Sequence, residues 1–335
     1  MSTDPAAPID ARAQAARTFA LAALGLADTA AVRFAPASAD ASFRRYFRLT
    51  HEAQSWVVMD APPEREDCKP FIEIAGLVLG AGLNGPRVLA EDLAQGFLLL
   101  SDLGRQTFLQ VITDDNADQL FGAAIAALVQ WQQASRAGVL PPYDEALLAR
   151  ELALFPDWYV ARHLGRSFTA EQQAWWDETC QLLIARALGQ ARVFVHRDYM
   201  PRNLMRSDPD PGVLDFQDAV YGPLSYDVVS LFKDAFRSWP AARVEGWRRQ
   251  YWDAARAAGL PVPGDYSRFV RDFDLMGLQR HLKVLGIFAR INYRDGKPAY
   301  LADTPRFIRY VREVVDHDAE LLPLKKLFDD LSLQA

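Results

Sequence analysis

The stretch VFVHRDYMPRNLM, residues 193–205, decides the expected fold together with VLDFQD at 213–218. A short apolar run leads to Asp198, and Asn203 follows five residues later. The intervening SDPDPG is rich in turn residues, so we expect the two apolar pieces to fold back on each other as a hairpin. That hairpin is expected to bring Asn203 and Asp215 to the same open end, which Asp198 approaches on the preceding loop.

Oxygen-bearing side chains in this arrangement suit phosphoryl transfer. Magnesium takes oxygen ligands and keeps nucleotide phosphates as partners, so Asn203 and Asp215 are predicted to supply the protein's share. Asp198 is predicted to orient and deprotonate an attacking hydroxyl. The kinase catalytic-loop pattern H-R-D-x-x-x-x-N is matched from His196 onward. The alternative is that Asp198 and Asn203 only cap turns. His196 is expected to hold the loop by hydrogen bonds rather than to transfer a proton.

The chain changes character near residue 104. Before it, SFRRYFRL and SWVVMDAP predict one strand hairpin, KPFIEIAGLVLG predicts a helix, and RVLAEDLAQGFLLLSDLG predicts two more strands. After it, apolar residues recur at three- and four-residue intervals. The expected fold class is α+β, with a small antiparallel-sheet lobe over 1–103, a junction near 98–104, and a larger, mostly helical lobe over 104–335. The predicted helices of this lobe cover 117–137, 143–163, 170–189, 241–258 and 266–291.

The composition excludes several classes of function. Of 335 residues, 37 are basic and 43 acidic, for a net charge of -6, so a nucleic-acid or anionic-membrane partner is not expected. Two cysteines are too few for a disulfide framework and fit a reducing compartment. Since no window approaches 18 uninterrupted apolar residues, we expect no membrane span, and the expected location is the cytoplasm. The expected oligomeric state is a monomer or a weak dimer.

The block HRDYMPRNLM…VLDFQDAVYGPLSYDVVSL resembles the aminoglycoside phosphotransferase-like kinases, small-molecule relatives of protein kinases. The resemblance implies a two-lobed protein-kinase-like fold that uses ATP and Mg²⁺, and a structural role for Asp227 in holding the catalytic loop. DASFRRYFRL, WVVMDAPPERED and QRHLKVLGIFARI resemble a bacterial branch of this family, the cell-wall-recycling anomeric sugar kinases. That narrower resemblance implies phosphorylation of N-acetylmuramate and N-acetylglucosamine at C1, in peptidoglycan recycling.

The expected nucleotide site departs from the kinase pattern. Kinases carry a strand lysine that pairs with the α/β-phosphates, but this chain has Met59 and Asp60 there and lacks a glycine-rich loop. Arg44 and Arg45 are expected to point to opposite faces of the first hairpin strand, so one of them can reach the phosphates, unless both are solvated. LLLSDLG resembles the lobe-connecting hinge, whose backbone groups bond the adenine edge. The candidate nucleotide-binding residues are Ser42, Arg44, Arg45, Glu73, Ser101, Asp102 and Leu103.

The acceptor pocket is expected in the helical lobe. Arg280, His281 and Asn292 are polar residues in an otherwise apolar helical stretch, and an arginine can pair with the carboxylate of N-acetylmuramate. Two alternatives stay open. The acceptor can be an aminoglycoside, choline or homoserine, or the chain can be a pseudokinase that binds nucleotide without transferring phosphate.

Overall fold

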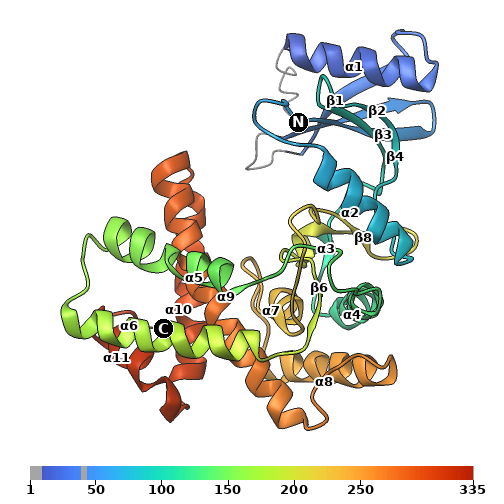
Figure 1. Ribbon diagram of the computed structural model, residues 1–335. Helices are drawn as coiled ribbons and strands as arrows, with labels where there is room; N and C mark the ends of the chain where they lie inside the picture. The colour runs from blue at the N-terminus through green and yellow to red at the C-terminus, as the bar shows by residue number, and fades with distance from the viewer. Residues whose placement is uncertain (1–9, 39–43, 335) are drawn as a thin grey trace. The chain divides into compact units, whose positions relative to one another are not determined.

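The computed structural model describes residues 10–38 and 44–334, and the chain divides into two compact units. The first unit comprises Met1–Gln106 and Met205–Asp218, and the second comprises Thr107–Leu204 and Ala219–Ala335. The first holds an antiparallel sheet and the second is mostly helical, which confirms the predicted α+β fold class (Figure 1).

The first unit is built on one five-stranded antiparallel sheet in the order β1-β2-β3-β5-β4. Its strands are β1 (Val32–Ser38), β2 (Arg45–His51), β3 (Gln54–Asp60), β4 (Val88–Asp92) and β5 (Phe97–Ser101). Both predicted hairpins, β2–β3 and β4–β5, are present, whereas β1 was not predicted. Pro36 interrupts the β1 sequence VRFAPAS, and the pairing with β2 shifts register after it.

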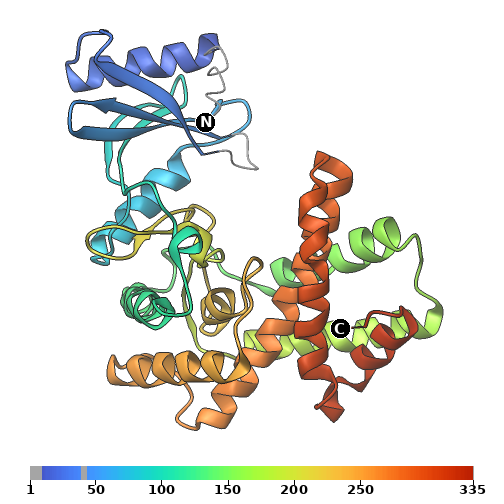
Figure 2. The same cartoon turned by 180° about the vertical axis from the view of Figure 1, so that it is seen from behind.

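Helix α1 (Ala11–Leu24) covers one face of this sheet (Figure 2). Its buried alanines pack against alternate strand residues, such as Phe47 and Leu49 of β2. Asp10 caps the start of the helix, and Gly25, with φ of 65°, ends it. Helix α2 (Lys69–Gly80) is the predicted helix between the two hairpins.

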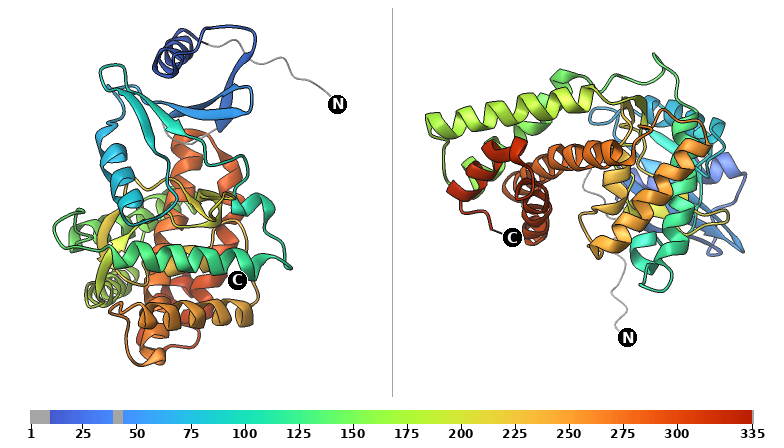
Figure 3. Two further views of the ribbon diagram at one scale, coloured as in Figure 1. Left: turned by 90° about the vertical axis from the view of Figure 1, so that its right-hand side faces the viewer. Right: turned by 90° about the horizontal axis from the view of Figure 1, so that it is seen from below.

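The second unit packs its helices around α9 (Tyr266–Asp295), which spans 30 residues. Apolar residues three or four positions apart along α9, among them Leu275, Leu278, Leu282 and Leu285, form its buried stripe. Helices α4 and α8 lie side by side at another part of this unit (Figure 3). The remaining helices are α3 (Phe108–Val111), α4 (Ala117–Gln133), α5 (Glu145–Leu152), α6 (Ala170–Leu188), α7 (Tyr226–Phe232), α8 (Ala241–Ala257), α10 (Thr304–Val315) and α11 (Leu322–Asp330). Short 3-10 turns occupy Pro201–Asn203, Pro298–Asp303 and Ala319–Leu321.

The segment predicted as one helix over 143–163 contains two elements. Helix α5 ends at Leu152, and a π-helix, Phe155–His163, follows it with Pro156 in its first turn. Proline lacks the N–H that would continue the α-helical ladder, which explains why the hydrogen-bonding pattern changes here. No helix among the described residues combines the length and the apolar character needed to cross a membrane.

Short strands interrupt the helices where the sequence predicted them. Strand β6 (Arg192–Val195) pairs antiparallel with β9 (Val220–Pro223), a partner that was not predicted. The predicted hairpin is present as β7 (Leu204–Met205) and β8 (Gly212–Val213). Strand β6 delivers the chain directly to His196.

Candidate active site

The loop that follows β6 is held by Asp227, which is fully buried on α7. Its carboxylate accepts the backbone N–H of His196 at 2.6 Å and that of Arg197 at 3.0 Å. Burial raises the pKa of Asp227, and although the two N–H donors lower it, the pKa is about 7. Arg197 has φ of 75°, a left-handed conformation that costs free energy unless the surroundings fix it. Asp227 therefore fixes the backbone immediately before Asp198.

Asp198 and Asn203 lie at the two ends of this loop and contact each other. The Asn203 side chain donates from Nδ2 to the Asp198 carbonyl oxygen at 2.9 Å. This bond fixes the orientation of the amide, so that Oδ1 points away from the Asp198 carbonyl. Asp198 itself is half-buried. The second unit thus brings these two predicted residues together.

Glu151 of α5 forms a buried ion-pair network with this loop. Arg197 donates to it at 2.5 Å, Lys283 at 2.8 Å and Gln279 at 3.1 Å, and the Tyr143 hydroxyl donates to it as well. Burial alone would raise the pKa of Glu151, but the neighbouring cations Lys283 and Arg197 and the hydrogen bonds lower it to about 2. The arginine of the H-R-D pattern is therefore anchored to an ionised carboxylate inside the protein.

Sequence reasoning missed both Glu151 and Lys283. Each is a charged residue within an apolar helical run, LLARELALF and QRHLKVLGIF respectively. Charged side chains are almost never fully buried unless they are paired, so each of these residues is a signal for a buried, paired charge, while the sequence does not say which residues form the pair.

Asp215 belongs to the first unit, on the segment 205–218. It has φ of 64°, and Gln217 donates to its Oδ1 at 2.9 Å. The adjacent Phe216 is fully buried and packs on Phe71 of α2, with ring centroids 5.0 Å apart. The half-buried Asp215 carboxylate is thus presented next to an anchored aromatic ring.

The two candidate cations of the first unit differ in their partners. Arg45 pairs with the fully buried Asp60 at 2.6 Å and also with Asp10. Arg44, which lies just before β2, pairs with Glu66 at 3.0 Å. Arg45 therefore carries a structural role between two carboxylates, a role the sequence did not reveal.

Two further nucleotide-site candidates, Ser42 and Glu73, were predicted near these arginines. Ser42 falls outside the described residues. Glu73 is exposed on α2, and the acidic partner that the structure gives Arg44 is Glu66 instead.

The candidate hinge residues are tied into the first unit. Asp102 forms a bidentate ion pair with Arg48 of β2, at 2.6 and 3.0 Å, a partner that was not predicted. Although burial opposes it, hydrogen bonds led by the one from Arg48 keep the pKa of Asp102 below its usual value. The Leu103 carbonyl accepts the Ser207 hydroxyl at 2.6 Å, and the Ser101 hydroxyl accepts a backbone N–H.

The three candidate acceptor residues occupy different surroundings on α9. Arg280 is buried, 3% exposed. His281 is also buried, its ring 5.5 Å from that of Phe307 and 5.1 Å from that of Tyr310, and burial lowers its pKa well below the usual value. Asn292 is half-buried and lies 12 residues further along, about 18 Å at the helical rise. The structure therefore does not bring Asn292 together with Arg280.

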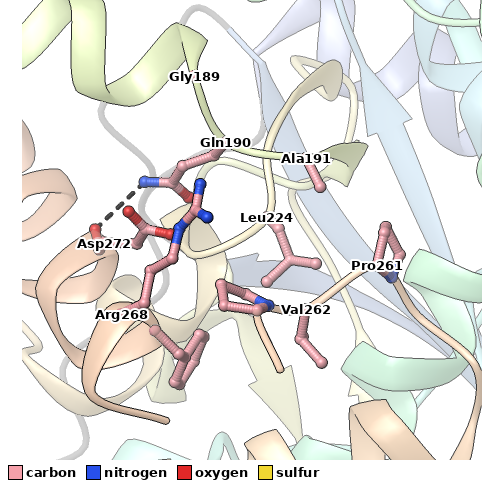
Figure 4. Close-up of a pocket in the computed structure, with 10 residues that line it drawn as sticks. Gly189, Gln190, Ala191, Leu224, Pro261, Val262, Arg268 and Asp272 are labelled. Carbon is pink, nitrogen blue, oxygen red and sulfur yellow. Dashed lines mark hydrogen bonds between the residues drawn. The ribbon is translucent and has the colours of Figure 1, made fainter. Parts of the chain in front are cut away.

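A separate pocket of about 210 Å³ lies where the turn after α6 meets α9 (Figure 4). Gln190 spans it, donating to the Asp272 carbonyl at 3.2 Å and accepting from Ser225. The residues that line it are Gly189, Gln190, Ala191, Leu224, Pro261, Val262, Pro263, Arg268, Phe269 and Asp272. None of them is a predicted site residue.

Comparison with known proteins identifies relatives along most of the chain. The model of the phosphotransferase enzyme family matches residues 33–268. An N-acetylmuramate/N-acetylglucosamine kinase of Pseudomonas aeruginosa is 60% identical over 296 residues, which cover 88% of each chain. A protein of the same name from Neisseria meningitidis is 48% identical over 300 residues, covering 88% of this chain and 89% of the relative.

Solved structures share the fold at much lower identity. The choline kinase of Streptococcus pneumoniae superposes with a TM-score of 0.63 at 10% identity, covering 90% of this chain and 99% of that one. At this identity the likeness concerns the fold alone.

Proposed function

Because the chain belongs to the phosphotransferase enzyme family, we propose that it transfers the γ-phosphoryl group of ATP to the anomeric hydroxyl of N-acetylmuramate or N-acetylglucosamine. The observation that carries the proposal is the loop in which Asp227 fixes the backbone before Asp198 and Asn203 fixes the Asp198 carbonyl. Phosphoryl transfer depends mainly on positioning and charge stabilisation, which such a loop provides. The choice of acceptor in this proposal is based on the names of the relatives. Because the proposed reaction consumes ATP, we propose the cytoplasm as its location.

Asp198 is the proposed base. It accepts the proton of the acceptor hydroxyl while that oxygen bonds to the γ-phosphorus, and the bond from the γ-phosphorus to the bridging oxygen of ADP breaks. An anomeric hydroxyl is more acidic than an ordinary alcohol, so its pKa lies closer to that of a carboxylate and the proton transfer is less unfavourable.

Asn203 and Asp215 are the proposed magnesium ligands. Both offer oxygen atoms, the donors that Mg²⁺ prefers, and the Asn203 amide is already oriented by its bond to Asp198. Within residues 10–38 and 44–334, no group of three or more His, Cys, Asp or Glu side chains can hold a metal. An asparagine and an aspartate suffice when phosphates and water complete the shell. When bound, the ion neutralises charge on the transferring phosphoryl group.

For the nucleotide we propose the backbone at Ser101, Asp102 and Leu103 for the adenine edge and Arg44 for the phosphates. Arg44 is preferred to Arg45 because two carboxylates, Asp10 and Asp60, already hold Arg45. Ser42 and Glu73 are also proposed as nucleotide-binding residues.

The test is ADP release with Mg-ATP over a panel of N-acetylmuramate, N-acetylglucosamine, choline, homoserine and an aminoglycoside. We expect turnover with the two amino sugars, and phosphorus–proton coupling in NMR that identifies a C1 phosphate. Asp198→Asn is expected to lower kcat by about 10²–10⁴-fold, with ATP affinity unchanged. Asp253→Asn, an exposed aspartate on α8, is the control. Full activity of Asp198→Asn would reject the role of the base, and product from choline alone would reject the acceptor.

A further inference from the structure

Charged side chains are buried in the second unit around the segment that follows α7. Asp234, in this segment, is 1% exposed, and Arg280 of α9 is 3% exposed. Arg306 of α10 is partly buried, with its side chain 20% exposed. Burying charge is costly unless hydrogen bonds and opposite charges compensate.

The compensation within the described residues is incomplete. Asp234 accepts the N–H of Ala235 through Oδ1 and also interacts with the N–H of Phe236, but its buried Oδ2 has no hydrogen-bond partner of good geometry. Buried Nη1 of Arg280 and Nε of Arg306 also have none. Buried polar groups normally have partners, so three incomplete ones on neighbouring elements indicate a place for a polar ligand.

Contacts around Ser238 connect the segment after α7 with helices α9 and α10. Arg306 donates from Nη1 to the Ser238 hydroxyl at 2.7 Å, and the Tyr310 hydroxyl lies 2.8 Å from the same oxygen. The Tyr310 ring in turn packs on His281, the neighbour of Arg280. Both Arg280 and Arg306 lower the pKa of Asp234, which burial raises to about 6, so both guanidinium groups act on one carboxylate.

This cluster lies next to the Asp198 loop within the same unit. The charges of Asp198 and Arg280 both act on Asp227, the residue that holds the loop. Arg202 lies on the loop itself, and Phe236 lies on the segment that carries Asp234. The guanidinium carbon of Arg202 is 4.9 Å from the centroid of the Phe236 ring. An acceptor bound at Asp234 would therefore lie on a segment that contacts the Asp198 loop.

The cluster has an excess of positive charge. Besides Arg280 and Arg306, the segment is contacted by Arg309, 3.2 Å from the Ser238 hydroxyl, and by Arg202. The acids near them include Asp234, Asp303, which lies 3.4 Å from Arg306, and Asp227, on which the charge of Arg280 acts. Guanidinium groups bind carboxylates in bidentate geometry, so this surplus suits a ligand that carries a carboxylate.

We propose that Asp234, Arg280 and Arg306 form the acceptor-recognition site, in which Asp234 accepts a hydrogen bond from a sugar hydroxyl and the two arginines bind the carboxylate of an acidic sugar. The proposal rests on the proposed kinase function and deepens it. N-acetylmuramate carries a carboxylate that N-acetylglucosamine lacks. Arg306 therefore determines how strongly the enzyme prefers the acidic sugar.

The experiment compares both sugars in Arg306→Gln. Because a charge-assisted hydrogen bond is lost, KM for N-acetylmuramate is expected to rise by about 10- to 100-fold, while KM for N-acetylglucosamine changes by less than about threefold. Arg306→Lys keeps the charge without the bidentate geometry and is expected to give an intermediate KM. Arg186→Gln, which removes an exposed arginine paired with Glu320, is the matched control.

A purely structural role of Arg306 would change both sugars alike, so equal shifts in KM, or none, would overturn the proposal. The wild-type enzyme separates this failure from that of the proposed function. If the wild type turns over both sugars and Arg306→Gln shifts both KM values equally or not at all, the recognition site alone is rejected. A wild type that is inactive with both sugars rejects the kinase function, and the site with it.

Discussion

Glu151 is a single residue on which several charged and polar partners converge next to the Asp198 loop. It is 4% exposed, and Lys283, Arg197, Gln279 and Tyr143 all donate to it. Removing two charges from water costs several kcal/mol each, and only good geometry with further hydrogen bonds offsets this. Glu151 meets that condition. The ion pair with Glu151 fixes the Arg197 side chain, and hence the loop that carries the proposed base.

The depressed pKa of Glu151 predicts acid sensitivity. The folded pKa of about 2 lies below the ordinary 4.5, so the stabilisation is fully present above pH 4.5 and is lost as pH falls toward 2. The shift corresponds to about 3 kcal/mol. Replacing the pair together, by Glu151→Gln with Lys283→Met, should make the free energy of unfolding fall less between pH 5 and pH 2.5 than it does in the wild type. Urea unfolding at several pH values measures this.

The control for that measurement is Glu320→Gln, which removes an exposed acid paired with arginines on the surface. Exposed pairs contribute little, so its pH dependence should resemble that of the wild type. If the double variant and the wild type lost stability in parallel on acidification, Glu151 would not be the group responsible.

At the scale of elements, α9 approaches the chain between α5 and the π-helix so closely that only glycine fits at residue 286. A Cβ on Gly286 would lie 2.3 Å from the carbonyl carbon and oxygen of Leu154. Because those are backbone atoms at the start of the π-helix, they cannot rotate away. Packing of α9 against this element, which buries Phe155 and Leu285, depends on that contact.

Gly286→Ala is therefore expected to destabilise the protein by about 1–3 kcal/mol, the usual cost of overpacking. The matched control is Gly246→Ala on α8, where nothing lies within 4 Å of an added Cβ. In an exposed helix interior alanine is better than glycine by about 1 kcal/mol, so this variant should be more stable than the wild type. Thermal and denaturant unfolding compare the two. Equal effects of both substitutions would show that the close approach has no energetic weight.

The elements also show what could be predicted from sequence. The hairpins β2–β3 and β4–β5 and helix α2 rest on local signals, alternation and turn residues, and were predicted. Strand β9 is short and contains Gly222 and Pro223, and its pairing with β6 spans some 28 residues, so local patterns do not reveal it. Candidate site residues followed the same rule. Asp198 and Asn203 belong to one motif, whereas the partnership of Glu151 with Lys283 depends on tertiary contacts 132 residues apart.

At the scale of the whole molecule, the chain does not divide at a single point. The segment 205–218, which carries Asp215, belongs to the first unit although most of its sequence neighbours belong to the second. The contacts that hold it there include Val213 N–H to the Asn84 carbonyl at 2.8 Å, Asn84 Nδ2 to the Pro209 carbonyl at 2.7 Å, the Ser207 hydroxyl to the Leu103 carbonyl, and Arg206 N–H to the Gln106 carbonyl at 2.8 Å. How firmly Asp215 is positioned therefore depends on Asn84, a residue far from any motif.

Asn84→Ala tests this dependence. The substitution removes the bond to Pro209 while keeping the backbone contact to Val213, a loss of about 1 kcal/mol. If Asp215 is a magnesium ligand, the Mg²⁺ concentration for half-maximal activity should rise by about 3- to 10-fold, as a loss of about 1 kcal/mol implies, because a looser ligand binds the ion more weakly. KM for the sugar should stay unchanged, since the proposed acceptor residues lie in the other unit. Asn116→Ala, which removes an amide bond to the Val111 carbonyl and another from the Thr113 N–H, is the control. A rise in sugar KM with an unchanged Mg²⁺ requirement would contradict the assignment of Asp215, because the anchoring segment would then act on the acceptor rather than on the metal.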